Sequence, residues 1–221
     1  MRLTRYGLDV VFRMLLIAGA LITCALLFVR VDAIKYALIG VVAVLVILVL
    51  NFFRDPERRT PAGNGCILSP ADGRVVIIKN GFEPEYLQQE AVQISIFMSP
   101  LDVHVNRIPV SGTIQYVKHV RGEFTAAFKE KSSDANERLL IGMECGNGQK
   151  IFFKQIAGAV ARRIVAEVAV GQSRENGERF GMIKFGSRVD IFLPKDSNIQ
   201  VQLHDRVIAG ESILATFSTK A

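Results

Sequence analysis

The chain has 221 residues, half of them apolar, and a formal charge of +6. This length accommodates one well-buried domain and a short additional segment. Residues 1–60 carry +4 of that charge, and the nearly neutral remainder has no basic stripe, which argues against a nucleic-acid-binding protein. The three cysteines and three histidines are far apart, so we expect neither a disulfide framework nor a metal site.

Two long apolar runs, residues 14–29 and 36–53, lie near the N-terminus. Each is close to the roughly 20 residues that cross a bilayer as a helix. Asp9 and Arg13 precede the first run and are four residues apart, so they can pair on one helix face and lengthen that helix. Only a tight turn fits between the runs, and residues 1–53 are therefore predicted to form a transmembrane helical hairpin.

Basic residues before and after this hairpin outnumber those in its turn. The predicted hairpin places the protein at the cell membrane. By the positive-inside rule, the basic residues favour a cytoplasmic position for residues 54–221. A hairpin that only dips into one leaflet remains an alternative. A cleaved signal peptide fits less well, because a second apolar run follows the first without a cleavage site between them.

Residues 54–221 are predicted to form a mainly β, antiparallel domain that resembles a sandwiched barrel. Short β-branched runs alternate there with turn residues, as in the hairpins of biotinyl and lipoyl carriers. Residues 161–170 alone also fit a helix, although their valine content leaves this open. The predicted strands include residues 66–70, 73–80, 91–100, 103–110, 112–120, 138–145, 150–158, 189–194, 199–203 and 206–217.

One Gly-Ser pair, Gly186-Ser187, lies between two strand-like stretches. By itself such a pair signals a turn. Glycine also permits unusual backbone conformations, so the Ser187 hydroxyl can approach the preceding carbonyl carbon at high effective concentration. Asp72 and His104 lie in polar turns and are candidates for activating this serine, since a triad does not depend on sequence order. Asp72 can instead cap its own turn, because a glycine follows it.

Several segments, in order between residues 52 and 215, together resemble the phosphatidylserine decarboxylase family in its short form. The resemblance implies a proenzyme that cuts itself at Gly186-Ser187 into residues 1–186 and 187–221, which stay together as a heterodimer. Ser187 would become a covalent pyruvoyl group, the cofactor, which forms a Schiff base with a membrane phospholipid. The products would be phosphatidylethanolamine and carbon dioxide. The matching segments are NFFRDPERRTP, ILSPADGRV, FMSPLDVHVNRIP, NERLLI, GERFGMIKFGSRVDIFLP and DRVIAGESIL.

The same resemblance assigns roles to individual residues. His104 would deprotonate Ser187 and later donate a proton to the substrate, and Asp72 would orient the imidazole ring. Longer family members have a second histidine where this chain has Arg107, so either His104 serves both steps or another group helps. Arg188 is a possible contact for the substrate's carboxylate or phosphate, or an exposed strand residue.

The alternative function, from a different class, is a membrane-tethered barrel that binds or carries a ligand with its chain intact. A diacyl lipid and an archaeal ether lipid with a serine head group are equally compatible with the sequence. The oligomeric state beyond the two chains is also left open.

Overall fold

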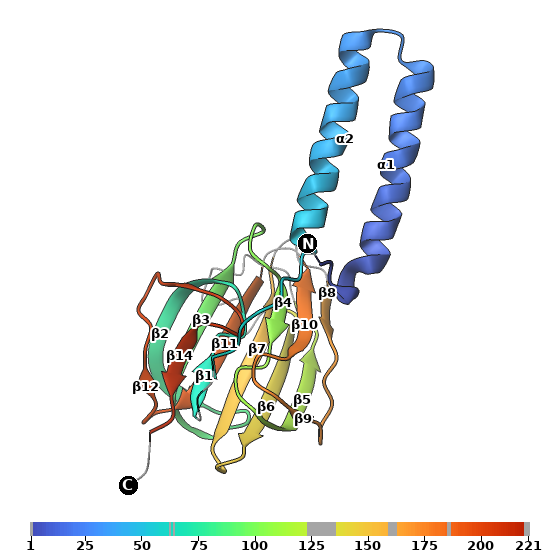
Figure 1. Ribbon diagram of the computed structural model, residues 1–221. Coiled ribbons are helices and arrows are strands. Elements are labelled where there is room, and N and C mark those ends of the chain that lie inside the picture. The colour runs from blue at the N-terminus through green and yellow to red at the C-terminus, as the bar shows by residue number, and fades with distance from the viewer. Residues whose placement is uncertain are drawn as a thin grey trace. The chain divides into compact units, whose positions relative to one another are not determined.

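The computed structural model describes residues 2–61, 63, 65–122, 136–158, 163–184 and 187–218. The chain divides into two compact units, Met1–Pro56 and Glu57–Ala221. The first is helical and the second is built of strands (Figure 1).

The first unit is the predicted helical hairpin. A short 3-10 helix, η1 (Arg5–Gly7), leads into α1 (Leu8–Phe28), and α2 (Asp32–Phe52) follows after a three-residue turn. The expected Asp9–Arg13 pair forms, with 2.6 Å between the Arg13 Nη2 and Asp9 Oδ2 atoms, and α1 begins before the apolar run as that pair suggested.

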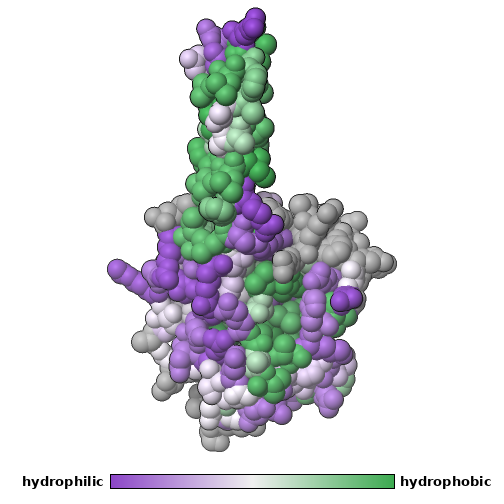
Figure 2. All heavy atoms as spheres, turned by 90° about the vertical axis from the view of Figure 1, so that its right-hand side faces the viewer, coloured by the Kyte–Doolittle hydropathy of each residue, from purple (hydrophilic) through white to green (hydrophobic). Residues whose placement is uncertain are grey.

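Both helices are long and apolar enough to cross a membrane. Most of their large apolar side chains are exposed, and Figure 2 shows this as a hydrophobic surface along the hairpin with hydrophilic residues at its turn. Exposed apolar area of this kind is consistent with contact with lipid rather than water. The two ends of the hairpin lie together, because the Thr4 N–H donates to Phe53 O at 2.9 Å and the Asp55 N–H to Arg2 O at 2.8 Å.

The second unit contains three sheets, and every strand pair in its described residues is antiparallel, which confirms the predicted fold class. The large sheet curls and has the order β13-β2-β3-β11-β7-β6-β5-β9 (Figure 1). Its strands are β2 (Gly73–Glu83), β3 (Gln89–Met98), β5 (Gly112–Val120), β6 (Arg138–Cys145), β7 (Lys150–Ala157), β9 (Ser173–Arg174), β11 (Ser187–Pro194) and β13 (Arg206–Val207).

Two three-stranded sheets complete this unit, with the orders β4-β10-β8 and β1-β14-β12. Strand β8 occupies part of the 161–170 segment, so the helical alternative for its described residues is wrong. The strands of these two sheets are β4 (Val105–Arg107), β8 (Arg163–Ala166), β10 (Arg179–Lys184), β1 (Cys66–Leu68), β12 (Asn198–Ile199) and β14 (Ile213–Thr216).

All three sheets contribute side chains to one hydrophobic core. Because successive strand residues point to opposite faces, β11 directs Val189, Ile191 and Leu193 into this core and places the residues between them on the other face. Strand β11 is central in the large sheet, with eight register pairs to β3 and six to β7.

Candidate active site

Ser187 is the first residue of β11, opposite Met98 of β3 on one side and Ala157 of β7 on the other. Its side chain is fully buried, and its hydroxyl donates to the Met98 Sδ atom at 3.2 Å. The other half of the predicted cleavage site, Gly186, lies outside the described residues. Ser187 is therefore held on both sides from the first position of its strand.

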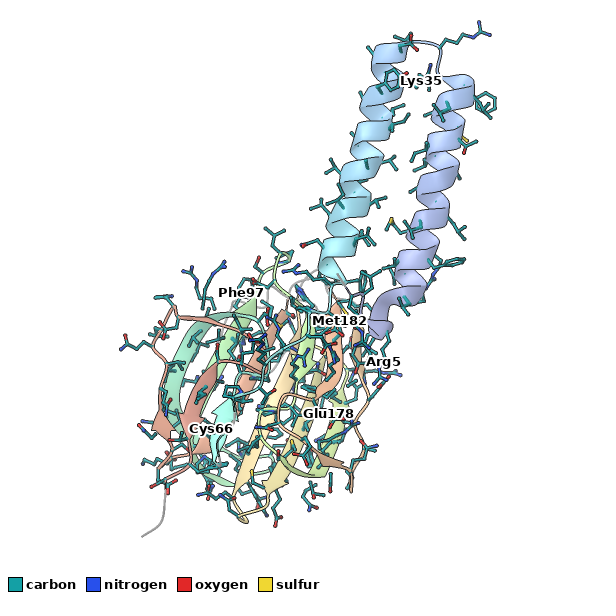
Figure 3. The ribbon with its side chains drawn as sticks, in the orientation of Figure 1. Arg5, Lys35, Cys66, Phe97, Glu178 and Met182 are labelled. Carbon is teal, nitrogen blue, oxygen red and sulfur yellow. The ribbon has the colours of Figure 1, made fainter. Side chains whose placement is uncertain are left out.

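His104 lies at the end of the loop that leads from β3 to β4. Strand β4 pairs with β10, and the Ile183 N–H of β10 donates to His104 O at 3.4 Å. The β3–β4 loop thus connects the large sheet to a small one, as the β10–β11 connection also does. Strand β3 neighbours β11, and β4 neighbours β10, so Ser187 and the fully buried His104 belong to the same junction between sheets. Figure 3 labels Phe97 of β3 and Met182 of β10, which lie near the C-terminal ends of their strands and help to locate this junction.

The imidazole of His104 contacts the backbone of its own loop. Its Nδ1 atom is 2.9 Å from the carbonyl oxygen of Asp102. A carbonyl can only accept a hydrogen bond, so Nδ1 carries the proton and the lone pair of the neutral ring is on Nε2. A neutral imidazole in this tautomer can act as a base through Nε2.

Asp72 lies in the turn between β1 and β2, where its carboxylate has two partners. Arg58 Nη2 donates to Oδ2 at 2.7 Å, and the Ala209 N–H donates to Oδ1 at 2.8 Å. None of the hydrogen bonds of Asp72 within the described residues runs to His104 or to its own turn. Burial raises the pKa of Asp72, with a further increase from the Asp102 charge, against the lowering effects of the Ala209 N–H and Arg58.

Two amides form a buried polar chain on the core side of this junction. Gln155 Nε2 donates to Asn106 Oδ1 at 2.7 Å, and Asn106 Nδ2 lies 3.3 Å from Pro70 O and 3.7 Å from Met98 Sδ. Met98 thus contacts both Asn106 and the Ser187 hydroxyl. Asn106 and Gln155 are polar residues within apolar strand patterns, and this was the available sequence signal for the chain of amides, which our sequence-based expectations did not include.

Arg188 points away from the core, on the face opposite Ser187. Its guanidinium forms an ion pair with Asp190, in which Nη2 donates to Oδ2 at 3.1 Å and Nε lies 2.8 Å from Oδ1. Gln93 Nε2 also reaches Asp190 Oδ2 at 3.2 Å. Both Arg188 and Asp190 are 0% exposed, so the alternative of an exposed strand residue is wrong.

Arg107, which stands where the resemblance implies a second histidine in longer family members, has a structural contact. Its Nη1 donates to Gly177 O at 2.8 Å, and its own N–H donates to Pro70 O at 2.9 Å. Within the described residues, no group of three or more His, Cys, Asp or Glu side chains is arranged to hold a metal ion.

The antiparallel fold, with a buried serine and histidine at a junction between sheets, defines a β-fold enzyme preceded by an apolar helical hairpin. The phosphatidylserine decarboxylase family model matches residues 45–215. The chain belongs to the phosphatidylserine decarboxylase family, and it is a decarboxylase.

Similar proteins cover nearly the whole chain. One from Chlorobium luteolum is 44% identical over 96% of this chain and 99% of its own. Another from Symbiobacterium thermophilum is 42% identical over 89% of this chain and 90% of its own. A third, from Chlorobium phaeovibrioides, is 49% identical over 81% of each chain. All three carry the name phosphatidylserine decarboxylase proenzyme.

Proposed function

We propose that this chain is a proenzyme that cuts itself between Gly186 and Ser187 and then converts phosphatidylserine to phosphatidylethanolamine and carbon dioxide. The observation that carries the proposal is the fully buried Ser187 hydroxyl at the same sheet junction as His104, in a chain that matches the family over residues 45–215.

Self-cleavage begins with His104 Nε2, which takes the proton of the Ser187 hydroxyl. The Ser187 oxygen attacks the Gly186 carbonyl carbon, the peptide C–N bond breaks, and the freed nitrogen takes up the proton. An ester then joins Gly186 to the Ser187 oxygen. Removal of the α-proton of residue 187 expels the Gly186 carboxylate and leaves a C=C bond, and uptake of water with loss of ammonia converts this end to a pyruvoyl group.

The surroundings of Ser187 fit a pyruvoyl group formed there. Residue 187 starts a strand paired on both sides, so the backbone that follows stays in place when the preceding bond breaks. When present, this ketone takes up the amine of the substrate and accepts the electrons that departing carbon dioxide leaves behind. After Nε2 takes up a proton from water, His104 can donate that proton to the substrate carbon.

Within the described residues, the side chains at this junction are buried. Ser187, His104 and Met98 are all 0% exposed. Cleavage would thus form the cofactor, while the sheet holds the two chains together as a heterodimer.

The hairpin places the enzyme at its lipid substrate. Two apolar helices with exposed side chains support anchoring at the cell membrane, and the distribution of basic residues supports a cytoplasmic catalytic unit.

A denaturing gel and mass spectrometry test this proposal. The purified protein should run as two fragments divided after Gly186, the smaller with an N-terminus that resists Edman degradation. Ser187→Ala should stay whole and inactive, because no nucleophile remains, whereas Ser187→Thr should cut slowly. The matched control is Ser95→Ala, which removes another fully buried hydroxyl of the large sheet and should still be cut.

Lipid mass spectrometry after incubation with defined phosphatidylserine gives the second measurement. Carbon dioxide release and phosphatidylethanolamine formation are expected from the cut protein only. An intact chain with full decarboxylase activity would contradict the proposal, and an intact chain that binds lipid without turnover would support the ligand-carrier alternative.

A further inference from the structure

The group that orients His104 is a backbone carbonyl of the same loop. The distance from His104 Nδ1 to Asp102 O is 2.9 Å, and this contact places the proton on Nδ1. In a serine–histidine pair the atom bound to Nδ1 decides which nitrogen acts as the base. The residue that fixes the direction of this carbonyl therefore determines whether Nε2 can take a proton.

Asp102 closes its own turn with both its backbone and its side chain. The Asp102 N–H donates to Ser99 O at 2.8 Å, and the Ser99 N–H donates to Asp102 Oδ2 at 2.8 Å. Pro100 occupies the second position of this four-residue turn, which its ring favours. The Leu101 N–H adds a contact to the Ser99 hydroxyl at 3.3 Å. Because the carboxylate and the carbonyl belong to one residue, bonding of the first restrains the direction of the second.

Asp72 is engaged elsewhere, although it is the residue that the family resemblance suggests for this role. Arg58 binds one of its carboxylate oxygens and the Ala209 N–H binds the other. Arg58 also lies 3.8 Å from Glu211, and the Arg59 N–H donates to Glu211 at 2.8 Å. Asp72 thus belongs to an ionic cluster that joins the segment after the hairpin to the loop between β13 and β14.

We propose that Asp102 is the positioning residue for His104 and holds its ring in the tautomer with the proton on Nδ1. Asp72 instead stabilises the ionic cluster that it forms with Arg58. The proposal rests on the proposed function, because it assigns the support of the base in that reaction. It gives to Asp102 the orienting role that the family resemblance suggested for Asp72.

Three variants of the full-length chain test the order of importance of the two aspartates. Asp102→Ala removes the bond to Ser99 and should slow self-cleavage by about 100-fold, as a misplaced catalytic group does. Asp102→Asn retains a side-chain oxygen for the Ser99 N–H and should restore most of that rate. Asp72→Asn should slow self-cleavage less than Asp102→Ala does. The rate is followed on gels as the uncut chain converts into two fragments after synthesis.

The opposite order would overturn the proposal. If Asp72 oriented the ring, Asp72→Asn would slow the reaction by about 10⁴-fold, as loss of the triad aspartate does elsewhere. Asp102→Ala would then cut at the wild-type rate.

A nitrogen-15 NMR measurement on the uncut Ser187→Ala protein gives a readout that does not depend on cleavage. The His104 ring should show a protonated Nδ1 and an unprotonated Nε2 at neutral or mildly alkaline pH, with resonances assigned by substituting His119 and His204. Adding Asp102→Ala should produce a mixture of tautomers, and adding Asp102→Asn should not. A folded Ser187→Ala protein in which Nε2 carries the proton would overturn the proposal.

The two proposals fail in different ways. A wild-type chain that is never cut, but whose His104 carries its proton on Nδ1, would remove the proposed self-cleavage and leave the positioning role intact. A chain that is cut, but whose ring does not respond to Asp102→Ala, would remove the positioning role alone.

Discussion

Arg188 and Asp190 show how the two faces of β11 serve different purposes. Residues two apart on a strand share a face, so Arg188 and Asp190 lie together on the side opposite Ser187. Both are fully buried, and their ion pair offsets charges that would otherwise be costly in the interior. The pair therefore stabilises the strand segment that immediately follows the predicted cut.

Replacing Arg188 should reveal this contribution to stability. Arg188→Met leaves the Asp190 carboxylate buried without its main partner, and the free energy of unfolding should fall by about 3–5 kcal/mol. Urea unfolding of the uncut Ser187→Ala protein measures the change. Adding Asp190→Leu should recover part of the loss, because the unpaired charge is then removed. Lys118→Met, which breaks an exposed pair with Glu85, is the control and should change stability far less.

Sequence alternation could predict that Arg188 and Asp190 share a face, but not that this face is covered. Burial of the outer face depends on segments distant in sequence, which strand periodicity does not reveal. The same limit applies to Asp72, whose partners Arg58 and Ala209 come from two other segments. Motif resemblance identified Ser187, His104 and Asp72 as candidates, while the bonds that orient each of them required coordinates.

At the scale of elements, the junction depends on close packing of β10 between β4 and β8. Gly181 of β10 lies opposite Asn106 of β4 and Ala166 of β8. A Cβ atom at Gly181 would come within 2.4 Å of Val165 O, a backbone atom that cannot move without shifting β8. Glycine at this position lets β8 approach the strand that leads to residue 187.

Gly181→Ala should therefore separate β8 from β10. We expect a loss of about 1–3 kcal/mol in the free energy of unfolding, as for other overpacked interiors. Self-cleavage should also slow, since β10 leads into the predicted cut. Gly81→Ala in β2 is the matched control, because a Cβ there meets nothing within 4 Å. Equal behaviour of the two variants in unfolding and cleavage assays would contradict this explanation.

Strands with clear alternation or strong β-branching were predictable, but the extents of several short strands were not. The run predicted at residues 199–203 forms a strand only at its start, in β12 (Asn198–Ile199). The sequence of residues 161–170 was compatible with a helix or a strand, and the pairing of β8 with β10 makes the residues of β8 a strand. Pairing between distant strands outweighs local preference in such segments.

At the scale of the whole molecule, the helical and β units have separate sets of internal contacts. The β unit has its own core, drawn from all three sheets. The hairpin was predictable because its two apolar runs exceed what a soluble helix needs. The division of the strands into three sheets was not, because it depends on long-range register.

Deletion of residues 1–56 should release a folded β unit. Because its core lies within residues 57–221, this fragment should remain in the soluble fraction and still cut itself, whereas the full-length protein should sediment with membranes. Cell fractionation followed by a gel measures both properties. Full-length Ser187→Ala, which should also sediment, controls for any effect of cleavage on membrane binding. A truncated chain that stays whole while folded would contradict this independence.

Because β11 is central in the large sheet, the protein would have to fold before the proposed cut, and unfolding after the cut would be difficult to reverse. A chain cut before Ser187 stays assembled, because its shorter piece is bonded to β3 and β7 within the large sheet. Once such a protein unfolds, however, the pieces diffuse apart, and reassembly becomes a second-order process that depends on concentration. If the proposed cut occurs, a cut molecule that unfolds can therefore regain its structure and activity only when its two pieces meet again.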